Sequence, residues 1–145
     1  MRKLSSLLAI IILAFTSSWA VDISHQEKDT ISAVARNYME AYYTGNAQLM
    51  QQTLHPDFHK RTLHNVNGKL EITEDTMESM VQGVNEGSGK NIPVNERVKN
   101  IEVLDIYKDV ASVKVTTGRW IDYMHLSKVN DEWRVLDVVL QYTKK

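Results

Sequence analysis

The sequence predicts an α+β domain in which helices come first and a curved antiparallel sheet follows. Two observations carry this prediction. Before residue 86, apolar residues recur at spacings of three and four through three segments, which is the period of a helix with one buried face. After Pro93, long apolar segments are separated by short polar turns, which is typical of strands. We therefore expect helices that cover one face of a bent sheet.

Met1 to Ala20 have the pattern of a signal peptide. Arg2 and Lys3 precede an apolar run of nine residues from Leu7 to Phe15, and small residues follow where a signal peptidase cuts. A permanent membrane anchor is the alternative, but such an anchor needs ~20 apolar residues. We therefore expect a periplasmic or secreted protein, with residues 21–145 forming one domain that has no stable membrane insertion.

Composition excludes several classes of function. The chain has 17 Lys and Arg against 18 Asp and Glu, evenly spread, so it offers no basic surface for nucleic acid. It has no cysteine, hence no disulfide framework and no cysteine nucleophile. It also lacks a glycine-rich phosphate loop and a recognisable serine–histidine–aspartate motif. We predict no cofactor.

The first predicted helix begins at a cap formed by Asp22 or Ser24 and ends near Thr44, where Gly45 can take the left-handed conformation of a helix cap. Its inward stripe consists of Ile31, Val34, Tyr38, Ala41 and Tyr42. Asn46 is then a good N-cap for a short second helix that includes Leu54. Pro56 should end this helix by forcing His55 out of the helical region.

A hairpin and a third helix are expected next. Phe58 to Val66 and Lys69 to Ile72 flank Asn67-Gly68, a dipeptide that readily adopts the two positive φ angles of a tight turn. Thr73 should then cap a helix from Glu74 to about Asn85.

Three long strands should complete the domain as an antiparallel meander. They run from Val94 to Tyr107, Val110 to Ser127 and Glu132 to Tyr142, with turns at Lys108-Asp109 and Asn130-Asp131. Strands of this length must bend, because ~5–6 residues is usual.

Gly118 is the expected site of a bulge in the middle strand. The last strand is apolar on both faces from Val135 to Leu140, so both faces should be covered. Helices can cover only one face. We therefore expect a homodimer through the sheet; a single subunit with a partly exposed outer face is the alternative.

Two stretches resemble the nuclear transport factor 2-like superfamily, and more closely its bacterial branch of putative lumazine-binding proteins. The first stretch contains Tyr42, Tyr43, Gly45, Asn46, His55, Pro56, Asp57 and Arg61. The second contains Trp120, Asp122, Tyr123, His125, Leu126, Trp133, Arg134 and Val135. The resemblance covers essentially everything after Val21. It implies a cone-shaped, cystatin-like fold with a pocket, favours a dimer through the sheet, and names no ligand.

Candidate ligand-binding residues come from several predicted elements. Tyr38 and Tyr42 lie one helical turn apart on the inward stripe, where they either pack in the core or donate to a ligand. Trp120 and Asp122 share one face of a strand and look like a pocket wall. Arg61 could clamp an anionic group or pair with Asp122 or Asp137.

Asp137 is the most informative single residue, because a carboxylate in an apolar strand needs a partner or a raised pKa. By period two it should share a face with Trp133 and Val135. Pairing with Arg61, Arg119 or a tyrosine hydroxyl is the structural interpretation. A role as ligand acceptor or general base is the functional one.

His55, Asp57 and His59 alternate along an extended segment, and histidine with carboxylate is a metal-ligating combination. A structural role is favoured, and we predict no metal site. Enzymes of the superfamily usually place an acidic base a few residues after the Asp that follows the second helix. Residues 58–62 of this chain contain no carboxylate, so no catalytic residue is assigned.

The sequence thus predicts a protein that binds a small, partly aromatic organic molecule through Tyr38, Tyr42, Arg61, Trp120, Asp122 and Asp137. Two alternatives stay open. One is an acid–base enzyme of the isomerase, dehydratase or cyclase type with Asp137 or His59 as base. The other is a module that recruits another envelope protein through its sheet.

Overall fold

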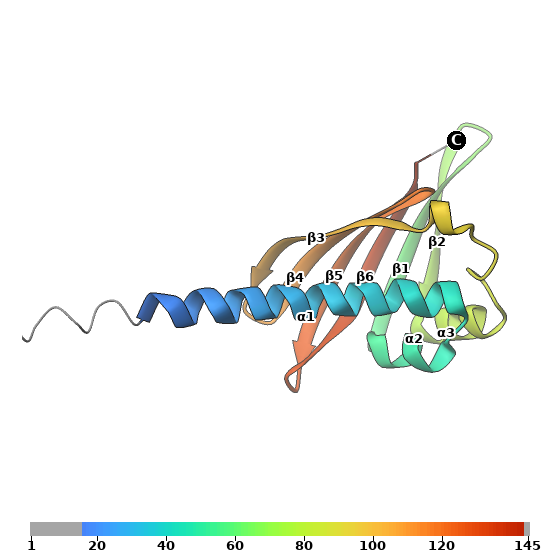
Figure 1. Ribbon diagram of the computed structural model, residues 1–145. Helices are drawn as coiled ribbons and strands as arrows, with labels where there is room; N and C mark the ends of the chain where they lie inside the picture. Colours follow the sequence, from blue (N-terminus) through green and yellow to red (C-terminus); the bar gives the residue numbers. More distant parts are fainter. Residues whose placement is uncertain (1–15, 144–145) are drawn as a thin grey trace, which may run out of the picture.

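The computed structural model describes residues 16–143 of the chain, with side chains from residue 25 (Figure 1). Met1 to Phe15, the greater part of the predicted signal peptide, lie outside the described residues. The helices are α1 (Thr16–Thr44), α2 (Ala47–Thr53), α3 (Met77–Asn85) and the 3-10 turn η1 (Val94–Glu96). The strands are β1 (Leu54–Val66), β2 (Lys69–Thr76), β3 (Val98–Tyr107), β4 (Val110–Thr117), β5 (Trp120–Val129) and β6 (Glu132–Tyr142).

One six-stranded sheet has the order β2-β1-β6-β5-β4-β3. All neighbours are antiparallel except β1 and β6, which are parallel, so the sheet is mixed and not purely antiparallel as predicted. The helix α1 runs along one face of this bent sheet, and α2 and α3 lie near the C-terminal end of α1 (Figure 1). The predicted α+β class is confirmed.

The core lies between α1 and the inner face of the sheet. On α1, Ile31, Tyr38 and Ala41 are buried as predicted, whereas Val34 and Tyr42 are partly buried at the edge of the core. Strands β4, β5 and β6 contribute alternate residues, which is the pattern of a sheet with one covered face. No helix in the described part of the chain is long and apolar enough to cross a membrane.

Several local predictions are confirmed. The side chain of Asn46 accepts a hydrogen bond from Leu49 N at 2.9 Å, which caps α2. Asn67 and Gly68 have φ angles of 52° and 83° in the β1–β2 turn. Positive φ angles also occur at Lys108 and in the turn between β5 and β6, where turns were expected.

Three helix boundaries differ from the prediction. The helix α1 begins at Thr16, so Asp22 and Ser24 lie inside it and neither is its N-cap. The helix α2 ends at Thr53, before Pro56, because Leu54 is already extended and pairs with Val135 of β6. The third helix begins at Met77, since residues 73–76 continue β2 by pairing with β1. Its N-cap is therefore Thr76, not Thr73.

The predicted middle strand is two strands joined by a tight reversal. The hydroxyl of Thr117 accepts hydrogen bonds from Arg119 N at 3.1 Å and Trp120 N at 2.9 Å, which closes the turn. Gly118 is needed here for close approach and not for a bulge. A Cβ at this position would lie 2.7 Å from Glu96 Cα. The reversal escaped prediction because β-branched and aromatic residues flank it on both sides.

A bulge does occur, but in β6. His125 pairs with Asp137 and Leu126 with Val135, so Leu136 is the extra residue. The bulge shifts the side-chain alternation by one position. Trp133, Val135, Val138 and Leu140 are the buried residues of β6. Asp137 therefore does not share a face with Trp133 and Val135 as predicted, but points to the outer face.

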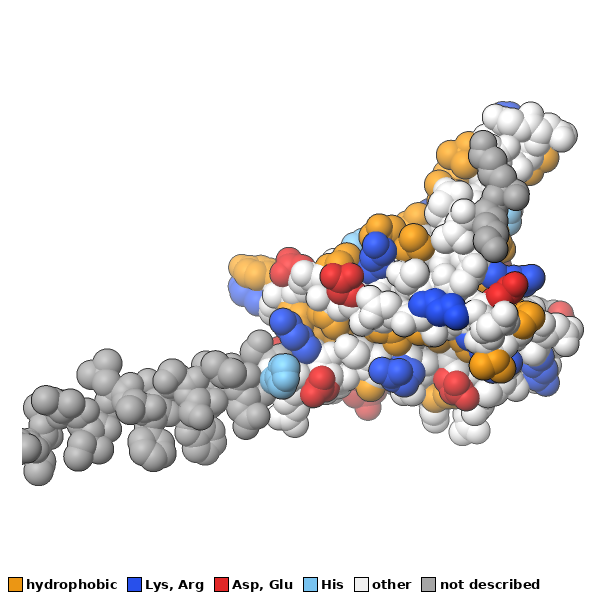
Figure 2. Space-filling view, turned by 45° about the horizontal axis from the view of Figure 1, so that its top comes forward, with side chains coloured by type: hydrophobic (Ala, Val, Ile, Leu, Met, Phe, Trp, Pro, Cys, Tyr) orange, Lys and Arg blue, Asp and Glu red, His pale blue; other side chains and the backbone are white. Residues whose placement is uncertain are grey.

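The outer face of the sheet is partly exposed in the single chain. Tyr123 is 47% exposed and Ile72 62% exposed, while Val139 is half-buried. In the view of Figure 2, Lys and Arg side chains are mixed with Asp and Glu, and neither sign of charge forms a separate patch on the face shown.

Candidate ligand-binding site

A cavity of about 280 Å³ lies between the inner face of the sheet and the helices α1 and α3. Residues of α1, α3, β1, β2, β5 and β6 line it, together with Ser88 after α3. Four of the six predicted site residues lie together at its wall: Tyr38, Tyr42, Trp120 and Asp122. Because they come from α1 and β5, tertiary packing brings them together.

Asp122 is the most unusual group at the cavity wall. It has no exposed surface, and Trp120 Nε1 donates a hydrogen bond to its Oδ2 at 2.8 Å. Its Oδ1 has no hydrogen-bond partner among the described residues. Burial raises the pKa of Asp122, although the positive charge of Lys60 and the hydrogen bond from Trp120 act in the opposite direction.

Lys60 supplies the positive charge of the cavity. Its side chain is buried with 8% exposure, and its Nζ donates to the hydroxyl of Tyr38 at 3.2 Å. The Nζ also lies 5.8 Å from the ring centres of both Tyr38 and Tyr42. None of the ion pairs formed within the described part of the chain includes Lys60 or Asp122.

Sequence reasoning missed Lys60, although a signal was present. Phe58, Lys60 and Thr62 alternate along β1, and all three are buried on the inner face. An extended segment that begins with a buried Phe58 puts residue 60 on the same side. The sequence favours Arg61 because a guanidinium group can clamp an anion in a bidentate pair, but Arg61 occupies the opposite face of β1.

Tyr38 and Tyr42 of α1 both keep their protons. Burial raises the pKa of Tyr38 well above its ordinary value, and the negative charge of Asp122 raises it further. Burial also raises the pKa of Tyr42, against the effect of Lys60. At neutral pH both hydroxyls are therefore available as hydrogen-bond donors as well as acceptors.

Aromatic side chains form a second part of the wall. The rings of Tyr42 and Trp120 meet edge to face with centres 6.2 Å apart, and Trp120 meets Tyr142 in the same way at 6.5 Å. Next to them, His64 Nε2 lies 3.0 Å from Thr73 Oγ1. The cavity thus combines aromatic surface with a few fixed polar groups, as small-molecule sites usually do.

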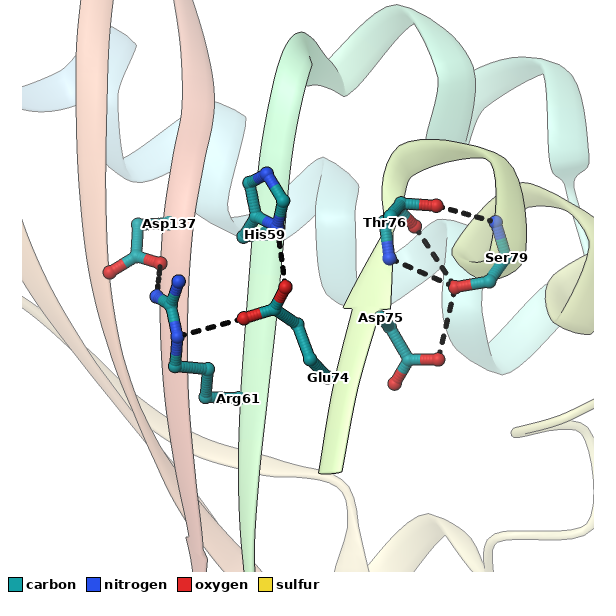
Figure 3. Close-up of polar contacts among 7 residues, drawn as sticks. All are labelled: His59, Arg61, Glu74, Asp75, Thr76, Ser79 and Asp137. Carbon is teal, nitrogen blue, oxygen red and sulfur yellow. Dashed lines mark hydrogen bonds and ion pairs between the residues drawn. The ribbon is translucent and has the colours of Figure 1, made fainter. Parts of the chain in front are cut away.

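A second carboxylate lies at the β2–α3 junction. Asp75 lines the cavity, and Ser79 Oγ donates a hydrogen bond to its Oδ1 at 3.0 Å (Figure 3). Thr76 N donates to Ser79 Oγ at 3.0 Å, so the capping of α3 also positions Ser79.

Arg61 and Asp137 do not line this cavity. Arg61 Nη1 donates to Asp137 Oδ1 at 2.8 Å, and Arg61 Nε contacts Glu74 Oε2 at 3.0 Å on the outer face (Figure 3). His59 Nδ1 lies 3.1 Å from Glu74 Oε1. His125 Nδ1 lies 3.7 Å from Asp137 Oδ2. The expectation that both groups converge on the pocket is wrong. Asp137 instead forms an ion pair with Arg61, which is the structural interpretation of this residue given by the sequence.

The alternating histidines of β1 have local partners. His55 Nδ1 accepts a hydrogen bond from Asp57 N at 3.1 Å, and Asp57 is exposed. His59 pairs with Glu74, as described above. Within residues 16–143, no three His, Cys, Asp or Glu side chains are grouped closely enough to hold a metal ion.

Solved structures share this fold. An NTF2-like protein with a cystatin-like fold from Novosphingobium aromaticivorans aligns with TM-score 0.66 and 9% identity, over 91% of this chain and 92% of its own. An NTF2-like protein of unknown function from Shewanella baltica aligns with TM-score 0.61 and 16% identity, over 83% of this chain and 96% of its own. A putative dehydratase from the NTF2-like family, from Streptomyces avermitilis, aligns with TM-score 0.59 and 10% identity, over 84% of this chain and 99% of its own. No curated protein matches the sequence.

The chain therefore has an NTF2-like fold with a cavity between its helices and the inner face of the sheet. A family model described as putative lumazine-binding matches residues 26–140, which is most of the chain. The protein belongs to this family.

Proposed function

We propose that this protein binds a small organic molecule in the cavity between α1, α3 and the inner face of the sheet. The observation that carries the proposal is that Lys60 and Asp122 are both buried in the cavity wall and form no ion pair within the described part of the chain, while Asp122 Oδ1 has no hydrogen-bond partner there. A buried charged group costs free energy unless it is paired, and folding alone would be served better by apolar side chains. A ligand that completes these hydrogen bonds explains why such groups stand in the cavity wall.

Native mass spectrometry of protein purified from its own host tests the proposal. We expect a bound mass that is lost on denaturation, lost in Lys60→Met and retained in Lys69→Met, since Lys69 is exposed in the β1–β2 hairpin. Lumazine, which the family description names, is the first compound to titrate into the empty protein. Absence of any bound small molecule, together with unchanged thermal stability across a metabolite library, would refute the proposal.

An acid–base enzyme on the same fold is the second candidate function, and the buried Asp122 favours it. A carboxyl group with a raised pKa beside a Lys–Tyr pair can accept a proton from a ligand while the pair stabilises negative charge on a neighbouring oxygen. In this version Asp122 replaces Asp137 and His59 as the base, because those two residues lie on the outer face. Chemical conversion of the bound compound that stops in Asp122→Asn, with binding retained, would favour this candidate.

We further propose that the mature protein begins at Val21 and acts in the periplasm or outside the cell. The support is the basic start and nine-residue apolar run of the precursor. Intact-mass measurement of the exported protein should give a chain without residues 1–20. An exported species that keeps the apolar run would contradict this.

We also propose that two copies pair through the outer face of the sheet. The support is the exposed apolar surface there, to which Tyr123 and Ile72 contribute. Recruitment of another envelope protein is the alternative use of the same face. Light scattering distinguishes them, because a monomer at high micromolar concentration leaves only the alternative.

A further inference from the structure

Lys60 and Asp122 reach into the cavity from two strands that do not touch. Strand β6 separates β1 from β5, and both Thr62 and Asp122 pair with Leu140 of β6. Neighbouring strands are ~4.8 Å apart and residues two positions apart on a strand ~6.6 Å apart, so the Cα atoms of Lys60 and Asp122 are separated by roughly 12 Å. Both side chains are on the inner face, yet no ion pair between described residues joins them.

The two groups have opposite hydrogen-bonding capacity. A lysine ammonium is a donor only, and one of the three N–H groups of Lys60 is used by Tyr38. An ionised carboxylate is an acceptor only, and Asp122 has one oxygen used by Trp120 and one without a partner. The cavity therefore offers a donor at one position and an acceptor at another.

We infer that the ligand is an uncharged ring compound that accepts a hydrogen bond from Lys60 and donates an N–H or O–H hydrogen bond to Asp122, as a carboxamide can. This inference rests on the proposed function and adds the chemical class of the ligand. The aromatic wall formed by Tyr42, Trp120 and Tyr142 accounts for the ring.

The charges of the cavity disfavour anionic ligands. Asp75 and Asp122 line it together with Lys60, so its lysine does not outnumber its carboxylates. A phosphate or a dicarboxylate would place further negative charge beside the buried Asp122, whose Oδ1 already lacks a donor. An uncharged amide has no such repulsion and meets both groups at once.

Access to Asp122 requires a side chain to move, because its exposed surface is zero. Tyr142 is 45% exposed and Tyr42 is partly exposed, so these two rings of the cavity wall can turn most readily. Rotamer changes of this size are common when a ligand binds.

Three matched probes test the inference: benzamide, N,N-dimethylbenzamide and benzoate. Benzamide has the acceptor and the N–H donor, the dimethyl compound lacks the donor, and benzoate replaces the donor with a charge. Titrations by ligand-observed NMR should show benzamide binding at least tenfold more tightly than either of the others. Benzoate as the tightest ligand, or failure of benzamide to bind at 10 mM, would overturn the inference. A small molecule found by native mass spectrometry would still support the proposed function.

Asp122→Asn provides the decisive variant. The amide oxygen of the substituted side chain would accept the Trp120 hydrogen bond, which places the NH₂ group where the unpartnered oxygen was. The site would then present a second donor, so the preference for benzamide over benzoate should fall at least tenfold or reverse. Asp137→Asn makes the same change on the outer face and should leave the preference unchanged.

Lys60→Met keeps the test decisive if Asp122→Asn fails to fold. Benzamide affinity should fall at least tenfold in Lys60→Met and stay within threefold of wild type in Lys69→Met. A preference among the three probes that is the same in Lys60→Met as in wild type would contradict the assignment of the acceptor position.

Discussion

Replacement of Trp120 by Phe tests the buried Trp120–Asp122 hydrogen bond most directly. The change removes the indole N–H that donates to Asp122 Oδ2 at 2.8 Å and leaves both oxygens of a fully buried carboxyl group without a donor. Loss of a hydrogen bond to a charged group costs ~1.5–3 kcal/mol. The smaller ring adds ~1 kcal/mol through lost packing. We therefore expect the free energy of unfolding to fall by about 2.5–4 kcal/mol.

A double-mutant cycle separates the two contributions. In an Asp122→Leu background the hydrogen bond is absent, so Trp120→Phe should cost only the ~1 kcal/mol of packing. The coupling energy between the two positions should then be about 1.5–3 kcal/mol. Urea unfolding followed by far-UV circular dichroism at pH 7 measures all four proteins. A coupling energy below ~0.5 kcal/mol would show that the hydrogen bond contributes little and would refute the reasoning.

Three further predictions concern pH, helix capping and assembly. Burial raises the pKa of Asp122 in the folded protein. The contribution of Asp122 to stability is therefore greatest below the unfolded pKa of ~3.9 and is lost as pH rises through the folded pKa. The urea midpoint of Asp122→Asn should accordingly rise relative to that of the wild type between about pH 3.5 and 7. Thr76→Ala removes the N-cap of α3 and should cost ~1 kcal/mol in the same assay, whereas Thr73→Ala should cost less because Thr73 is not the cap. Val139→Asp puts a charge on the outer face and should dissociate a dimer in light scattering, while Val138→Asp should unfold the protein because Val138 is fully buried.

Local sequence signals predicted those parts of the fold that local chemistry decides. Asn46 caps α2 because its side chain reaches the N–H of Leu49, and this depends only on neighbouring residues. Asn67-Gly68 forms a tight turn for the same kind of reason. The turn at Gly118 depends instead on a distant contact, since Gly118 N donates to Glu96 O at 2.9 Å. A single sequence does not reveal that contact.

The third helix shows how tertiary pairing overrides a local cap. Thr73 is a reasonable N-cap by residue type, and Thr76 is another. The choice falls on Thr76 because Glu74 pairs with Arg61 across the hairpin, and this pairing keeps residues 73–76 extended. Only the register between β1 and β2 decides between them, and the turn at Asn67-Gly68 sets that register.

The candidate site was predictable wherever an element kept its simple period. Tyr38 and Tyr42 follow from the helical stripe of α1, and Trp120 and Asp122 follow from alternation along β5. Alternation along β1 would also have placed Lys60 in the cavity wall, because Lys60 lies two positions after the buried Phe58 and so shares its face. The error at Asp137 has a different origin, because β6 does not keep its period.

The bulge at Leu136 decides which charged residues face the cavity. Without this extra residue, Asp137 would alternate inward with Val135 and add a third carboxylate to Asp75 and Asp122. With it, Asp137 turns outward to Arg61, and the pair satisfies itself on the outer face. The inner face is left with Lys60 as the cation nearest Asp122 in the cavity wall, and no other group in the described chain completes their hydrogen bonds. The one extra residue in β6 thus puts Asp137 on the outer face, where the protein itself supplies its ion-pair partner Arg61. Lys60 and Asp122 stay on the inner face, where a ligand can complete their hydrogen bonds.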